Sequence, residues 1–505
     1  MTSAKPSFAK DFAKVLGIFA VLWSLLYLPL AIGVPTADHD PNLGAIALQA
    51  RHWQESGSPQ RFSILWGGGT LFSGLVEQAP WSPAVLLALV LGPKAGGMGW
   101  MWAQLSFGGA ALYGWFRSEG AKHHPALVGA IGAWCTLWLA RHAIDGHLAW
   151  GAFALCISLG WTFAKGPKWM PLWTGLQALL LLSSSHLQAP LYGWPVVLFG
   201  MALGLRRHPT QVLWGVAACV PALALHGRLW ADAWRAGQLY ERGQLIAAQD
   251  VRFATGWAPK LLGILLPGAS YGAHAEGNLL ALLPALFATK RWPQRWVWGA
   301  AAALIALALI PNVGPFRQAE RLLWGLPLLA GWHLAQAPLP QWAERLSLGL
   351  GVGGAALLMA LRMVSGLGAP TGPEPAPGIQ GVALPQQSYD ISEAYIGGLV
   401  AQIQAGQVVH RPAGHLALEQ VPERGTSLSL SPNFHAKGTD PRLVVTGPWE
   451  PGSLVVLQLR DGGWQVSGCA ALRTEGRWLF LVGTGRCSAV TLTLSSLPDQ
   501  KTPPD

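Results

Sequence analysis

The chain has 505 residues, of which 51% are hydrophobic and only 11% are charged. Soluble proteins carry about 25% charged residues, so the composition argues against an ordinary soluble enzyme. The net charge of +10 does not indicate nucleic-acid binding, because Lys and Arg are scattered through short segments between apolar runs and form no basic face. The 27 Trp and 62 Gly residues are typical of membrane proteins.

Apolar runs long enough to cross a bilayer follow one another through residues 1–365. The first, at about 15–34, is too long for the core of a cleaved signal peptide, so we expect a retained helix with a cytoplasmic N-terminus. The others lie at about 97–116, 126–140, 148–164, 169–185, 190–205, 210–226, 275–289, 296–311, 322–337 and 346–364. The sequence therefore predicts a polytopic α-helical membrane domain with about eleven transmembrane helices. The apolar segments 83–92 and 259–272 are short, which is more typical of interfacial or re-entrant segments.

Charge supports an alternating topology. If the N-terminus is cytoplasmic, every predicted inner loop carries Lys or Arg, as the positive-inside rule requires. These inner residues are Arg117, Lys122, Lys165, Lys168, Arg206, Arg207, Lys290, Arg291, Arg295 and Arg345. The predicted long outer loops span about 35–82 and 227–274, and the residues from 227 to 260 read as amphipathic surface helices or as a packed external loop.

The character of the sequence changes near residue 366. Residues 366–380 form a Pro/Gly-rich linker, and 381–505 contain short β-branched runs separated by Gly, Pro, Asp and Asn, which predicts an all-β, sandwich-like domain. The expected strands are 427–430, 442–446, 453–459, 478–482 and 489–494. An odd number of spans places this domain outside the cytoplasm. There, Cys469 and Cys487 are the candidate disulfide pair, whereas the cysteines within the apolar runs are expected to be small core residues.

Ionisable residues collect on the predicted outer face. Asp38 and Asp40 lie just after the first span, and two carboxylates at this spacing suit a general base or a divalent cation. A solvated loop with a helix N-cap at Asp40 explains them equally well. Whether the protein uses a metal therefore stays unknown from sequence, and Asp38 and Asp40 are the only ligands we would name.

Further polar groups lie on separate outer loops. They are Arg141, His142, Asp145, His147, His186, Gln188, Glu276, Arg317 and Arg321. Arginines at the edge of a bundle suit a phosphate, and an acid such as Glu276 at the mouth of a span is costly unless it has a function. The alternatives are interfacial polar residues, a structural histidine, and snorkelling or internally paired arginines. We find no phosphate-binding Gly-rich loop followed by Lys and Ser/Thr, no Gly-x-Ser-x-Gly elbow and no His-Glu-x-x-His pair.

The order of these features resembles the GT-C superfamily of membrane glycosyltransferases, most of all its YfhO-like branch. Asp38-His-Asp40 is followed by Leu65-Trp-Gly-Gly-Gly-Thr-Leu-Phe and Gln78-Ala-Pro-Trp-Ser-Pro83. The later counterparts are Gly146-His147, the partly kept Ser185-His-Leu-Gln188, and Phe316-Arg-Gln-Ala-Glu-Arg321 before Leu328-Leu-Ala-Gly331. Together these motifs cover about residues 11–337. The chain is shorter than typical members and has fewer spans.

The resemblance implies a polyprenyl-phosphate-linked sugar as donor and an envelope glycan, lipid or protein as acceptor, in a bacterial inner membrane. Asp38 or Asp40 would act as base, and Arg141, Arg317 or Arg321 would face the departing phosphate. Two other functions remain open. A non-catalytic envelope-assembly scaffold, or degenerate relative, would make the β-domain the working part. A transporter or flippase for lipid-linked substrates would favour inverted repeats, of which we see none that is convincing.

Overall fold

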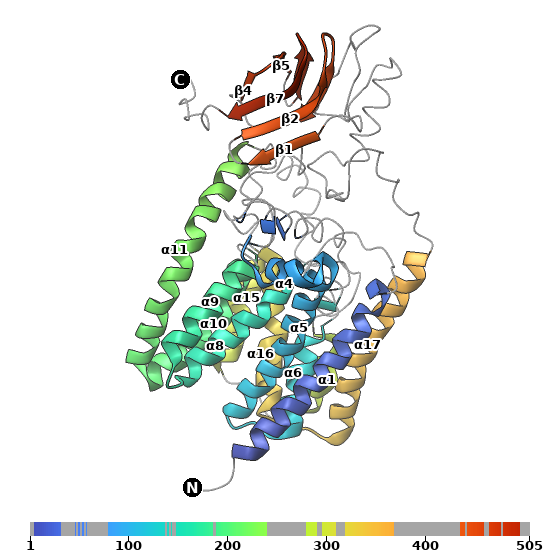
Figure 1. Cartoon of the computed structure of the whole chain (residues 1–505). Helices are drawn as coiled ribbons and strands as arrows, with labels where there is room; N and C mark the ends of the chain where they lie inside the picture. The colour runs from blue at the N-terminus through green and yellow to red at the C-terminus, as the bar shows by residue number, and fades with distance from the viewer. Residues whose placement is uncertain are drawn as a thin grey trace. The chain divides into compact units, whose positions relative to one another are not determined.

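The computed structural model describes residues 5–31, a few positions between 46 and 57, 79–136, 139–140, 143, 148–184, 188–239, 279–289, 295–309, 319–367, 435–439, 442–458, 464–475 and 478–494. The chain divides into two compact units, one helical and one carrying the strands, and each is described by itself. Figure 1 shows the elements of both.

Each of the eleven apolar runs of spanning length that the sequence indicated overlaps a helix. The elements are α1 (Lys5–Ala31), α4 (Pro83–Leu91), α5 (Pro93–Ser118), α6 (His123–Trp134), η1 (Leu148–Ala152), α8 (Phe153–Lys165), α9 (Met170–Ser184), α10 (Gln188–Arg207), α11 (Pro209–Leu239), η2 (Leu280–Leu282), α14 (Leu283–Ala288), α15 (Arg295–Leu309), η3 (Ala319–Trp324), α16 (Gly325–Ala335) and α17 (Gln341–Leu367). The short run 83–92 is the separate helix α4, and 259–272 lies outside the described residues.

Only one of the described helices is long and apolar enough to be identified as a membrane span by length and composition, namely residues Pro209–Ala231 within α11. Arg295–Ala308 and Leu322–Ala335 are apolar but shorter. The mostly helical architecture is thus established, whereas the number of membrane spans stays a prediction.

Local sequence explains where α4 ends and α5 begins. Ser82 caps α4 by accepting a hydrogen bond from the Val85 backbone N–H (3.3 Å), and Pro83 occupies the first turn, where no N–H is needed. Gly92 then adopts a positive φ of 83°, which stops the helix, and Pro93 starts the next one. The two helices pack against each other as a hairpin.

Helix α5 forms the centre of the helical unit, because α1, α4, α6, α8 and η1 all pack against it. Glycines allow the closest contacts. A Cβ added at Gly129 of α6 would lie 2.5 Å from the Gly331 carbonyl oxygen of α16, and one at Gly331 would lie 2.6 Å from the Gly129 oxygen. Such close backbone approach through small residues is typical of membrane helix pairs.

The second unit holds seven described antiparallel strands in two sheets, which confirms the expected all-β character of this part of the chain. The strands are β1 (His435–Thr439), β2 (Arg442–Trp449), β3 (Leu454–Gln458), β4 (Trp464–Ser467), β5 (Ala470–Glu475), β6 (Trp478–Gly483) and β7 (Cys487–Leu494). Their order is β1-β2-β7-β4 in one sheet and β3-β6-β5 in the other. Of the expected strands, 427–430 lies outside the described residues.

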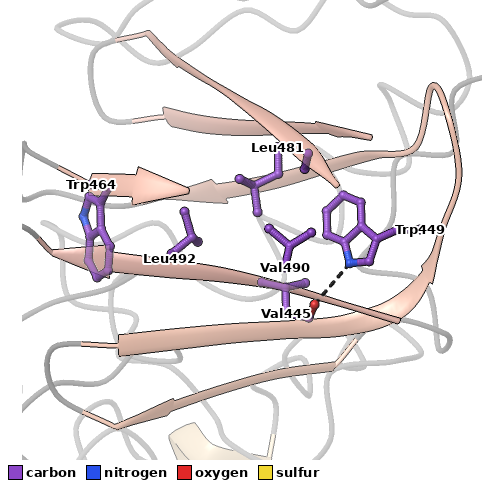
Figure 2. Close-up of a cluster of buried hydrophobic side chains, with 7 residues drawn as sticks. Val445, Trp449, Trp464, Leu481, Val490 and Leu492 are labelled. Atoms are coloured by element: carbon purple, nitrogen blue, oxygen red, sulfur yellow. Dashed lines mark hydrogen bonds between the residues drawn. The ribbon is translucent and has the colours of Figure 1, made fainter. Parts of the chain in front are cut away.

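Residues from both sheets build one hydrophobic core (Figure 2). Val445 and Trp449 of β2 meet Leu481 of β6 and Val490 and Leu492 of β7, and all five are buried. The indole N–H of Trp449 donates to the Val445 carbonyl oxygen at 3.1 Å. The disulfide Cys469–Cys487 packs against this core and confirms the predicted pair, with a Cα–Cα distance of 5.9 Å.

Candidate functional site

Most of the predicted site residues lie outside the described residues. These are Asp38, Asp40, Arg141, His142, Asp145, His147, His186, Glu276 and Arg317. Gln188 is the first residue of α10 and Arg321 lies in η3, but only their backbone is described. The structure does describe the helix ends to which these polar segments are joined, and those ends define the candidate site.

The helical unit has two ends with different chemistry. We call the inner end the one where α5, α8 and α10 finish, at Ser118, Lys165 and Arg207. We call the outer end the opposite one, where α9 finishes at Ser184 and α10 begins at Gln188. In Figure 1 the chain starts at the inner end with α1. The alternation expected from the positive-inside rule assigns the inner end to the cytoplasmic side.

A carboxylate joins three helix ends at the inner end. Glu119 accepts two hydrogen bonds from Arg207, at 2.8 and 2.9 Å, and its carboxylate lies 3.3 Å from Lys165 Nζ. Only 9% of the Glu119 side chain is exposed. Burial alone would raise its pKa, but the Arg207 hydrogen bonds and the positive charges of Lys165 and Arg207 outweigh burial and hold the pKa below its ordinary value. The cluster therefore serves as a structural clamp.

The outer end holds a histidine that links three segments. His226 of α11 is fully buried, and its Nδ1 lies 2.8 Å from the Ala222 carbonyl oxygen of the preceding turn. A carbonyl can only accept, so Nδ1 carries the proton and Nε2 is left to accept. Nε2 accepts the indole N–H of Trp81 at 3.2 Å and lies 3.4 Å from the Ser183 hydroxyl. The backbone of Ala79 also donates to the Ser183 carbonyl at 2.8 Å.

These contacts fix the end of the long first outer loop. The predicted outer loop with Asp38 and Asp40 follows α1, which ends at Ala31, and the chain is described continuously again from Ala79. Its returning end, Ala79 and Trp81, is thereby fastened to α9 and α11. Trp100 of α5 adds a further link, because its indole N–H donates to the Ser184 hydroxyl at 2.9 Å.

An aromatic cluster of four rings joins the remaining outer segments. Phe153 of α8 stacks on Trp324 of η3 with 4.1 Å between ring centroids, and Trp150 of η1 lies beside Phe153 and Tyr192 at 5.0 and 6.1 Å. The Trp324 indole N–H donates to the Tyr192 carbonyl oxygen of α10 at 2.8 Å. Elements η1, α8, α10 and η3 thus meet at one place.

Three of these elements, η1, α10 and η3, follow or contain predicted polar residues, and α8 continues from η1. His147 precedes Leu148 of η1, Gln188 opens α10, and Arg321 lies one turn before Trp324. The structure therefore brings to the outer end the described residues Ala79, Leu148, Gln188 and Ala319, which follow the predicted polar residues Asp40, His147, His186 and Arg317 along the chain. Glu276 precedes η2, and the Leu282 side chain of η2 packs at Gly132 of α6.

A buried amide that the sequence analysis did not single out lies beside this cluster. Gln104 of α5 is 3% exposed, and neither its amide nitrogen nor its amide oxygen makes a hydrogen bond with any residue that the structure describes. A Cβ added at Gly151 of η1 would lie 2.7 Å from its amide oxygen. Buried amides are normally satisfied, so Gln104 is a candidate contact for a water molecule or a ligand. A lone glutamine within an apolar span was the available sequence signal.

Within the described residues no group of three or more His, Cys, Asp or Glu side chains is placed to hold a metal ion. The ligands that the sequence suggested, Asp38 and Asp40, lie outside those residues, so the metal hypothesis stays a prediction. Trp81, His226, Ser184 and Gln104 are the polar groups that the structure adds to the site.

Comparison with known proteins gives no assignment. No protein-family model, no curated protein and no solved structure matches this chain. The functional conclusions below therefore rest on the residues and on the geometry of the helical unit.

Proposed function

We propose that the chain is a polytopic membrane glycosyltransferase of the GT-C type. It moves a sugar from a polyprenyl-phosphate donor to a glycan, lipid or protein acceptor of the cell envelope, on the outer face of a bacterial inner membrane. The β-rich domain lies on that same face. The observation that carries the proposal is that described residues following four of the predicted polar segments lie at the outer end of the helical unit.

The surface of the helices supports a membrane location. Val90 of α4, Phe287 of α14 and Leu357 of α17 are 81%, 85% and 61% exposed, and Leu213 and Trp214 of α11 are each 65% exposed. Soluble monomers rarely present large apolar side chains so widely over so many elements. Residues Pro209–Ala231, which pass the test for a span, are only 28% buried within the protein, so most of that surface is free to contact lipid.

The inner end carries the features of a membrane interface. Exposed tryptophans lie near the start of four helices there, namely Trp169, Trp214, Trp298 and Trp342. Lys and Arg accompany them along the predicted cytoplasmic loops. Tryptophan favours the headgroup region and basic residues favour the cytoplasmic side, so the pattern agrees with the expected orientation.

The reaction needs two kinds of group. Asp38 or Asp40 removes the proton of the acceptor hydroxyl, whose oxygen then bonds to the anomeric carbon of the sugar as the bond from that carbon to the phosphate oxygen breaks. The leaving lipid phosphate keeps the electron pair and is stabilised by Arg141, Arg317 or Arg321. Arg321 lies in η3, and the described residues that follow the other four lie at the outer end, where the aromatic cluster and the His226 contacts are found.

The experiment is a titration of the purified chain in lipid with a short-chain polyprenyl-phosphate hexose, following binding and sugar release. We expect binding and turnover in the wild type, and loss of turnover with retained binding in an Asp38→Asn/Asp40→Asn variant. Asp11→Asn, at the inner end of α1, is the matched control and should leave turnover unchanged. Failure to bind any donor in a small panel would contradict the proposal and favour a non-catalytic scaffold.

A further inference from the structure

A surface on α9 and α11 at the inner end combines exposed apolar side chains with unpaired positive charge. Helix α9 presents Trp169, Leu172 and Trp173, which are 63%, 65% and 48% exposed. Helix α11 presents Leu213 and Trp214, each 65% exposed. Trp169 directly precedes α9, and the backbone N–H of Trp173 donates to the Trp169 carbonyl oxygen at 3.0 Å, so the helical turn extends to it. At i, i+3 and i+4, Trp169, Leu172 and Trp173 therefore share one face.

The two helices form one continuous surface because their backbones touch. The Thr174 hydroxyl of α9 donates to the Gly215 carbonyl oxygen of α11 at 3.0 Å. A Cβ added at Gly175 would lie 2.9 Å from the Ala218 carbonyl oxygen. The side chains that point away from this contact are thus neighbours on the outside of the helical unit.

The turns at the inner end of this surface also touch. A hydrogen bond of 2.8 Å links His208 Nε2 to the Phe163 carbonyl oxygen, and a Cβ at Gly166 would contact both His208 and Gln211. The turn before α9 and the turn before α11 therefore lie against each other. Lys168 lies in the turn before α9, and Arg206 lies in the last turn of α10, two residues before His208.

Lys168 and Arg206 differ from their basic neighbours. Lys165 and Arg207 both pair with Glu119, whereas Lys168 and Arg206 are exposed and form no ion pair with any described residue. The ammonium of Lys168 lies 5.9 Å from the centroid of the Trp169 ring, so this charge lies beside the apolar face. Two free cations thus border a surface of Trp and Leu side chains.

We propose that this surface binds an anionic phospholipid of the inner leaflet. The headgroup phosphate contacts Lys168 and Arg206, and the acyl chains lie along Trp169, Leu172 and Trp214. Charge complementarity selects the anionic headgroup, since basic residues between neighbouring spans on the cytoplasmic side attract such lipids. The inference rests on the membrane location in the proposed function, but not on glycosyl transfer.

The test measures lipid retained by the purified full chain, using native mass spectrometry after reconstitution with equal amounts of phosphatidylglycerol and phosphatidylcholine. We expect preferential retention of phosphatidylglycerol, and a preference about fivefold weaker in Lys168→Gln and in Arg206→Gln. Arg228→Gln removes the same charge from the outer part of α11 and should keep the preference. Trp169→Ser should lower retention of phosphatidylglycerol, whereas Trp298→Ser on α15 should not.

Three results would overturn the inference. They are equal retention of both lipids by the wild type, an unchanged preference in both charge variants, and displacement of the lipid by inorganic phosphate alone, which would indicate a free-anion site. Retention of neither lipid would instead contradict the membrane location itself. A chain that retains phosphatidylglycerol as expected but releases no sugar would support this inference while contradicting the proposed transferase.

Discussion

Replacing Gly331 by Ala tests whether α6 and α16 meet through their backbones. A Cβ at Gly331 would lie 2.6 Å from the Gly129 carbonyl oxygen and 3.0 Å from the Ala133 side chain. Ordinary contacts between such atoms need about 3.5 Å, so the helices must separate by roughly 1 Å. Backbone cannot rotate away as a flexible side chain would, so the separation spreads along both helices.

The magnitude follows from two opposing effects. Overpacking of this kind costs about 1–3 kcal/mol, whereas Ala gains about 1 kcal/mol over Gly in a helix. The difference is a net loss of about 0–2 kcal/mol, and we expect about 1 kcal/mol lower free energy of unfolding for Gly331→Ala. The matched control is Gly353→Ala on α17, where nothing lies within 4 Å of an added Cβ and only the helical gain applies.

The assay is thermal unfolding of the purified protein in detergent, followed by tryptophan fluorescence. We expect Gly331→Ala to unfold at a lower temperature than the wild type, and Gly353→Ala to unfold at the same or a higher temperature. Equal unfolding temperatures for the two variants would refute the close contact between α6 and α16.

Three further predictions follow. Glu119→Gln should cost about 2 kcal/mol at pH 7, because two charge-assisted hydrogen bonds are lost. Because the pKa of Glu119 is held low, its contribution to the free energy of unfolding is fully present above pH 4.5, the ordinary value, and is lost as the pH falls through the lowered pKa. Wild type and variant should therefore differ at pH 7 and converge in acid, and equal stability at pH 7 would contradict the clamp. Glu344→Gln, on a residue with no described ion pair, is the control in the same fluorescence assay. Replacing Cys469 and Cys487 by Ser should destabilise the β-rich unit by about 3 kcal/mol, and an unchanged chemical-denaturation midpoint would contradict a structural role. Trp81→Phe removes the hydrogen-bond donor to His226 and should speed proteolysis within residues 32–78. The free energy of global unfolding should change by no more than about 1 kcal/mol. An unchanged cleavage rate would contradict the role of Trp81 in holding the end of that segment.

The helices were predictable from sequence because their signal is local. A run of apolar residues of spanning length leaves few alternatives to a helix, and each predicted run overlaps one. The bounds of the separate helix α4 are also local, because Ser82 caps its start, Pro83 lies in its first turn and Gly92 ends it. Composition suggests that these helices insert into a membrane. Among the described helices, only Pro209–Ala231 is long and apolar enough to be identified as a span by length and composition.

Three strands were missed because their sequences carry no β signal of their own. β1 (His435–Thr439) is polar and contains Gly, β4 (Trp464–Ser467) has four residues, and β5 (Ala470–Glu475) combines small and charged residues. Each is held by a partner strand with a stronger apolar or β-branched sequence, namely β2, β7 and β6. Pairing across the sheet, not local propensity, decides their conformation.

The site could be predicted only as a set of loops. Sequence placed the polar segments on one face through charge alternation, but it could not show that Trp81 meets His226, because 145 residues separate them. The same holds for Glu119 and Arg207, which are 88 residues apart. The basic residues of the inner loops were read as topology signals, and the carboxylate that fastens two of them emerges only from the folded arrangement.

The most direct test of the central assignment is the accessibility of single cysteines in sealed right-side-out vesicles. Lys122→Cys and Gln341→Cys report on the inner end, Arg228→Cys reports on the outer end, and all are made in a chain whose three free cysteines are replaced by alanine. We predict that a membrane-impermeant maleimide labels Arg228→Cys at once, and labels the other two only after the vesicles are permeabilised. Equal labelling of all three positions in sealed vesicles would contradict a polytopic membrane protein with its site on the outer face.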